Sequence, residues 1–151
     1  MANSPSDLYE RDYYAWLQDQ VRALRERRIE EVDWENLAEE IDGLSRSEKR
    51  GIKSHMAVLV EHLLKLQYAR GIFREFNARG WRVSVRSARR HVSTLLDESP
   101  SLRSQLGEML VDAYVDGRLE ALRVRGLSED VLPETCPWGI GQVMDDDFLP
   151  G

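Results

Sequence analysis

The sequence is poor in cysteine and has no long apolar run, and each absence excludes a class of protein. Its 151 residues include one cysteine, Cys136, so neither an internal disulfide nor a CxxC metal or redox motif can form. The longest uninterrupted apolar run covers residues 56–60, whereas a bilayer-spanning helix needs ~20. We therefore expect no membrane span. The 5 prolines, 10 glycines and 42% hydrophobic residues are typical of a globular chain rather than a disordered one.

Signals for secretion and for common catalytic chemistry are also missing. Residues 1–7 have neither the basic start nor the apolar centre of a secretory signal, which favours the cytoplasm. No GxSxG, P-loop or GxGxxG motif occurs, and Cys136 stands between Thr135 and Pro137 in a segment without periodicity. We therefore expect no catalytic residue and no cofactor, and the sequence leans away from an enzyme.

What the sequence does contain is helical periodicity. Apolar residues recur three and four positions apart along most of the chain, which predicts amphipathic helices and no sheet. Helix starts are indicated at Asp7, at Asp33 and at Ser99 followed by Pro100, and a connection at Gly71 and residues 77–80. The sequence does not decide whether the helix that starts at Asp33 ends at Gly43 or continues through it, since a glycine destabilises a helix by only ~1 kcal/mol. We expect about two thirds of the residues in helices.

The predicted fold class is all-α, an antiparallel bundle of four to five long helices with a short-helix C-terminal tail packed on it. We expect one domain over residues 1–151, with residues 1–6 disordered. Residues 127–151 form the irregular tail, with short helices near 128–132 and 138–144. The predicted core contains Trp16, Leu37, Ile41, Met56, Leu59, Leu63, Leu66, Val85, Val92, Leu95, Leu106 and Met109. Tyr13, Leu17, Val21 and Leu24 are expected to form the apolar face of the first helix.

Seven short blocks follow one another in an order that is specific, although each block alone is weak. They are 8–17 (LYERDYYAWL), 33–41 (DWENLAEEI), 46–50 (RSEKR), 62–68 (HLLKLQY), 99–102 (SPSL), 133–138 (PETCPW) and 147–150 (DFLP). Over nearly its whole length the sequence resembles the bacterial domain-of-unknown-function family numbered twenty-nine. It departs from the family after Tyr68, where ARGIF replaces a proline-containing stretch. The resemblance implies an all-helical fold and a bacterial origin, and it supplies no catalytic residue.

Charge is unevenly distributed, and this produces the main candidate site. Residues 46–91 hold 12 basic residues against 3 acids, whereas the rest of the chain holds 9 against 24. The candidate contact residues are Arg82, Arg86, Arg89 and Arg90, predicted to lie opposite the buried side of their helix. They could bind a polyanion, because arginine grips phosphate bidentately and the nearby Phe73, Phe76 and Trp81 could stack on bases. The favoured interpretation is internal pairing, in which most of the four arginines meet acids from other segments, chiefly Glu35, Glu39 and Glu40.

The three histidines are weak metal candidates. His55 and His62 share a helix face, and His91 belongs to another helix. Three imidazoles with an open position would suit zinc, but no HExxH or ExxH pattern occurs. We therefore predict that the histidines do not assemble a metal site.

The sequence indicates a class of function and no specific activity. A helical interaction or regulatory module that binds a protein partner fits best, and self-association is possible. Binding of nucleic acid or another polyanion by the arginine stripe of residues 70–90 is the alternative, which the net charge of −6 disfavours. A metal-dependent enzyme ranks below both.

Overall fold

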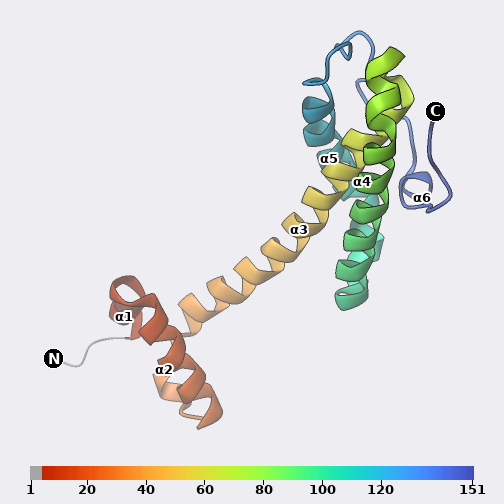
Figure 1. Cartoon of the computed structure of the whole chain (residues 1–151). Helices are drawn as coiled ribbons and strands as arrows, with labels where there is room; N and C mark the ends of the chain where they lie inside the picture. Colours follow the sequence, from red (N-terminus) through yellow and green to blue (C-terminus); the bar gives the residue numbers. More distant parts are fainter. Residues whose placement is uncertain (1–4) are drawn as a thin grey trace. The chain divides into compact units, whose positions relative to one another are not determined.

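The structure is a computed structural model that describes residues 5–151, and 76% of them are helical. No strand occurs in that range, which confirms the all-α class. Figure 1 shows the α-helices, which are α1 (Pro5–Arg11), α2 (Tyr13–Arg25), α3 (Trp34–Tyr68), α4 (Gly71–Glu98), α5 (Leu106–Ala121) and α6 (Ile140–Val143). Short 3-10 helices cover Ile29–Glu31 and Pro100–Gln105. None of the helices described is long and apolar enough to cross a membrane.

The chain divides into two compact units, Met1–Ser47 and Glu48–Gly151, and α3 contributes to both. The expectation of one domain stays a prediction. Of residues 1–6, predicted to be disordered, the first four lie outside the described residues, while Pro5 and Ser6 belong to α1. Helix α3 continues through Gly43, which answers the question that the sequence left open.

In Met1–Ser47, the first helices are organised around Trp16. Asp12 caps α2 by accepting a hydrogen bond of 3.0 Å from the Ala15 amide. The Trp16 ring is fully buried, and its Nε1 donates to Asp33 Oδ2 at 3.2 Å. Gln20 is also buried, and its Oε1 accepts from the Asp33 amide at 2.7 Å. This polar contact turns the Trp16–Gln20 side of α2 inward.

The apolar face predicted for this helix is wrong for three of its four residues. Tyr13, Val21 and Leu24 are exposed, and Leu17 is half-buried. The segment is helical, as its spacing predicts, but the buried side of α2 consists of Trp16, Gln20 and Ala23. Gln20 is buried because its amide has a backbone partner, which a hydrophobicity pattern does not register.

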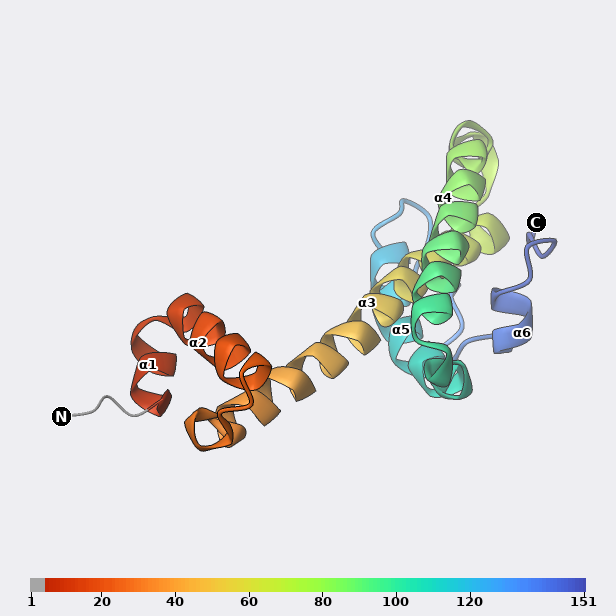
Figure 2. The same cartoon turned by 90° about the horizontal axis from the view of Figure 1, so that it is seen from below.

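Glu48–Gly151 contains the large core, formed where α3, α4 and α5 pack together (Figures 1 and 2). Helix α4 begins at Gly71, whose φ of 70° favours glycine, and runs through residues 77–80, so the connection predicted there is wrong. Gly117 of α5 is buried against the backbone of α3. Nine predicted core residues are confirmed as buried: Trp16, Met56, Leu59, Leu63, Leu66, Val85, Val92, Leu106 and Met109.

The other three predicted core residues are not buried. Leu37 and Leu95 are half-buried, and Ile41 is exposed. Beside Leu95, it is Leu96 that enters the core. Nothing in Met1–Ser47 covers Ile41, although its spacing along α3 is that of a core residue.

The C-terminal tail packs on the helices of the second unit through buried side chains and backbone contacts. Leu132 and Val143 are buried. The Pro133 carbonyl accepts hydrogen bonds from the Tyr114 hydroxyl at 2.6 Å and from Arg118 Nε at 2.8 Å. Burial raises the pKa of Tyr114 to about 12. Helix α6 falls within residues 138–144, whereas residues 128–132 form a turn instead of the predicted helix.

Candidate interaction surfaces

Helix α4 turns one mixed basic and apolar face to solvent. With 3.6 residues per turn, eight exposed residues between positions 72 and 90 fall within an arc of about 120°. Seven of them are basic or apolar, and the eighth is the acid Glu75. Phe76 is 80% exposed, among the most exposed apolar side chains. We call this surface the basic face of α4. It consists of Ile72, Phe76, Arg79, Arg82, Val83, Arg86 and Arg90.

Within the second unit, Glu48–Gly151, the arginines of this face have no carboxylate partner. Neither an ion pair nor a side-chain hydrogen bond joins Arg82, Arg86 or Arg90 to an acid of that unit. Of the acids predicted to pair with them, Glu39 lies 3.9 Å from Arg46 and Glu40 accepts hydrogen bonds from two tyrosines. Both contacts lie inside Met1–Ser47. Pairing of these arginines with acids of Met1–Ser47 would join the two units, and it stays a prediction. Within the second unit, the basic face of α4 is open to an anion or an acidic surface.

Arg89 is a correction, because it points inward rather than outward. Its side chain is 1% exposed, and it donates from Nε to the Val143 carbonyl and from Nη2 to the Phe148 carbonyl, each at 2.8 Å. Burial lowers the pKa of Arg89, and the charges of Asp146 and Asp145 partly oppose that shift. Position 89 borders the buried side of α4, so its long side chain reaches the tail. Arg89 therefore holds the tail and is not part of the open face.

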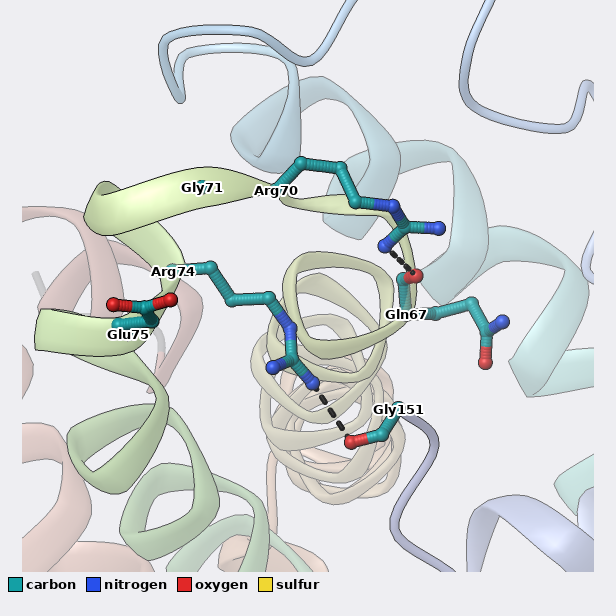
Figure 3. Close-up of a pocket in the computed structure, with 6 residues that line it drawn as sticks. All are labelled: Gln67, Arg70, Gly71, Arg74, Glu75 and Gly151. Atoms are coloured by element: carbon teal, nitrogen blue, oxygen red, sulfur yellow. Dashed lines mark hydrogen bonds between the residues drawn. The ribbon is translucent and has the colours of Figure 1, made fainter.

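Two arginines near the start of α4 are also engaged with backbone carbonyls (Figure 3). Arg74 donates from Nε to the Leu66 carbonyl at 3.2 Å and from Nη2 to the Gly151 carbonyl at 2.7 Å. Arg70 donates from Nη1 to the Gln67 carbonyl at 2.7 Å. The contacts to Leu66 and Gln67 satisfy carbonyls at the end of α3, where the last four carbonyls have no partner within the helix. The adjoining cavity of about 440 Å³ is therefore bordered by arginines that already have structural roles.

The structure brings two of the three histidines together. The rings of His55 on α3 and His91 on α4 stack with centroids 4.6 Å apart and planes 9° from parallel. They line a cavity of about 300 Å³ beside Val58 and Val83. Burial lowers the pKa of His55, and the charge of His91 lowers it further. His62 is separate, with Nδ1 2.7 Å from the Val58 carbonyl. No group of three metal-ligating side chains gathers anywhere in residues 5–151.

The first part of α3 carries an exposed apolar stripe. Trp34, Ile41 and Leu44 are 58%, 59% and 69% exposed, and Leu37 between them is half-buried. Their spacing of three, four and three places all four side chains on one side of the helix. No residue from 34 to 47 is buried. We call these four residues the apolar seam of α3.

A hydrogen-bonded cluster borders the seam. Tyr9 and Tyr13 donate their hydroxyls to the two carboxylate oxygens of Glu40, each at 2.6 Å. The hydrogen bond to Glu40 raises the pKa of Tyr9 to about 12, and the bonds from Tyr13 and Tyr9 lower the pKa of Glu40. Sequence reasoning missed this cluster, since no spacing rule joins residues 27 and 31 positions apart. It attaches α1 and α2 to α3 and keeps a negative charge beside Leu44.

Comparison with known proteins gives a family and no activity. No curated protein matches the chain, and no solved structure does. The model of the family described as "Domain of unknown function DUF29" matches residues 8–149, which agrees with the ordered blocks in the sequence. The chain therefore belongs to the DUF29 family.

Proposed function

We propose that this protein is a bacterial cytoplasmic interaction module that binds a helix of a protein partner along the apolar seam of α3. The observation that carries the proposal is the exposure of Trp34, Ile41 and Leu44, each more than half open to solvent. Their three–four spacing is the pattern by which one helix receives the side chains of another. A row of large apolar side chains on one exposed helix face is typical of a binding surface.

The stability of α3 supports the same conclusion. An isolated helix is marginal in water, and most helices in proteins are stabilised by packing one face against a neighbour. Residues 34–47 contain Gly43 and two serines, and none of these 14 positions is buried. Further along α3, Ile52, Met56 and Leu59 lie on the same side of the helix and are buried in the second unit. A helix bound to the seam would supply the packing that the first part lacks.

The cytoplasmic setting rests on cysteine. The single Cys136 is half-buried, and burial raises its pKa, which keeps the thiol protonated and unreactive. A chain that relies on packing rather than disulfides suits a reducing compartment. The bacterial origin follows from the resemblance of the sequence blocks to the family.

Site-specific photocrosslinking in cells tests the proposal. A photoreactive residue at position 41 should form a discrete adduct with a partner protein, whereas the same residue at position 39, on the opposite side of α3, should not. The adduct should disappear when Leu44 is also replaced by Gln. The purified partner should then bind the wild-type chain and not the Leu44→Gln variant. Equal crosslinking from positions 41 and 39 would refute the proposal.

A second candidate function, polyanion binding, is favoured because Arg82 and Arg86 are exposed and have no carboxylate partner within Glu48–Gly151. Phe76 on the same face could stack on a base. The test is fluorescence anisotropy with single-stranded and double-stranded DNA and RNA at low salt. Specific use of this face predicts micromolar binding that weakens steeply with salt and disappears in an Arg82→Gln/Arg86→Gln variant. Absence of binding at low salt would remove this candidate.

A further inference from the structure

The apolar seam of α3 and the basic face of α4 match each other in length. The seam runs from Trp34 to Leu44, about 15 Å along a helix axis at 1.5 Å per residue. The apolar residues of the basic face run from Ile72 to Val83, about 17 Å by the same measure. Ile72, Phe76 and Val83 are four and seven positions apart, with Arg79 completing a four–three–four pattern. Such a row can interdigitate with the three–four–three row of the seam.

Charge distinguishes the possible pairings of these surfaces. Met1–Ser47 holds 6 arginines against 12 acids, so the surroundings of the seam are strongly negative. Between residues 72 and 90, α4 holds six arginines and one acid, Glu75. Two seams facing each other would bring like charges together, and so would two basic faces. Only a seam against a basic face joins opposite charges, and complementary charge of this kind selects partners and orientation.

We infer that the partner of the seam is a second copy of this chain, with the apolar seam of α3 in one copy packed on the basic face of α4 in the other. This inference rests on the proposed function and names its partner. Each copy offers one seam and one basic face, so a two-fold symmetric dimer contains the contact twice. The arrangement covers Trp34, Ile41 and Leu44 together with Phe76. It also gives Arg82 and Arg86 an acidic surface, in agreement with the charge segregation of the sequence.

Matched variants test the dimer by sedimentation velocity. The wild-type chain should sediment as a dimer that weakens as salt is raised, because exposed charges are screened. An Ile41→Gln/Leu44→Gln seam variant and an Arg82→Glu/Arg86→Glu face variant should each weaken the dimer at least ~10-fold. Circular dichroism should show unchanged helix, since all four side chains are exposed.

Two controls carry the same chemistry elsewhere. Val115 and Leu119 on α5 are each 57% exposed, so a Val115→Gln/Leu119→Gln variant matches the seam variant. Arg123 and Arg125 are exposed, and the ion pair of Arg123 with Glu120 at 3.2 Å is also exposed, so an Arg123→Glu/Arg125→Glu variant carries the same charge change as the face variant. Both controls should remain dimers. Equal weakening by a control and its matched variant would overturn the inference.

Mixing the two variants is the sharpest test. Alone, each variant lacks both contacts, because every contact needs an intact seam and an intact basic face. A mixed pair regains one contact, formed by the seam of the face variant and the basic face of the seam variant. Fluorophore-labelled variants should therefore associate with each other more tightly than with themselves. Failure of mixing to restore association, as expected for seam-to-seam pairing, would overturn the inference.

The remaining outcomes separate this inference from the proposed function. A monomeric wild-type chain that crosslinks from position 41 to a different protein would overturn the second-copy inference and leave the proposed function standing. A monomeric chain whose basic face binds nucleic acid would also overturn the inference. Adducts between two copies of the chain, formed at position 41 and lost in the Arg82→Glu/Arg86→Glu background, would support both.

Discussion

Gly117 is the position at which one methyl group should measure how closely α5 approaches α3. A Cβ built on this residue would lie 2.6 Å from the Ala57 carbonyl oxygen, 3.0 Å from Val60 Cγ1 and 3.1 Å from the Glu61 amide nitrogen. Two of these three atoms belong to the backbone, so a side-chain rotation cannot relieve the contact. In a Gly117→Ala variant, α5 would have to move away from α3.

The expected magnitude follows from two opposing terms. Alanine is a better helix former than glycine by about 1 kcal/mol, whereas overpacking a filled core typically costs about 1–3 kcal/mol and occasionally more. The severity of the 2.6 Å contact places the cost at the upper end. We therefore expect Gly117→Ala to lower the free energy of unfolding by about 1–2 kcal/mol.

Gly107 provides the matched control on the same helix. A Cβ at this position meets nothing within 4 Å, so Gly107→Ala should raise stability by about 0.5–1 kcal/mol. Urea unfolding followed by circular dichroism at 222 nm measures both variants. The reasoning is refuted if Gly117→Ala is as stable as the wild-type chain, or if both variants shift the midpoint in the same direction.

Three further predictions follow from the core, the Glu40 cluster and the tail. Leu59→Ala should cost about 2–5 kcal/mol in urea unfolding, because the side chain is fully buried, and a loss below about 1 kcal/mol would contradict that burial. Glu40→Gln should lower the pKa of Tyr9 from about 12 toward 10, measured by absorbance near 295 nm; an unchanged titration would contradict the role of Glu40. Because the folded-state pKa of Glu40 is depressed, its contribution to stability is present above its unfolded pKa of about 4.3 and is lost as pH falls through the lower folded value. Arg89→Met should speed hydrogen exchange around α6 and Arg90→Met should not, and equal protection in the two variants would show that the tail is held otherwise.

The helices and the large core of the second unit could be predicted from the sequence because their physical cause is local. The four–three spacing of Met56, Leu59 and Leu63 places them on one side of any helix that they form, and burying such a row is strongly favourable. The start of α3 after Asp33 is similarly local, since a side-chain oxygen there can accept a hydrogen bond from the first helical turn. These features hold whichever elements pack together.

The candidate surfaces were only half predictable. Ile41 and Leu59 have the same kind of spacing along α3, yet one is exposed and the other fully buried. Periodicity identifies the apolar side of a helix and does not say whether the same chain covers it. That difference is the basis of our proposal that the seam binds a partner.

The exposure of the four candidate arginines depended on the tertiary structure more than any other predicted feature did. Arg82, Arg86, Arg89 and Arg90 look alike in the sequence, and Arg89 alone is buried. Position 89 borders the buried side of α4, and the carbonyls of Val143 and Phe148 come within reach of its guanidinium only after the tail folds over the helix. Helical spacing determines which way a side chain leaves the helix. Whether that side chain then meets solvent or a backbone carbonyl depends on residues far along the chain. The two carbonyls that Arg89 contacts are 54 and 59 residues away, and only folding brings them to its guanidinium.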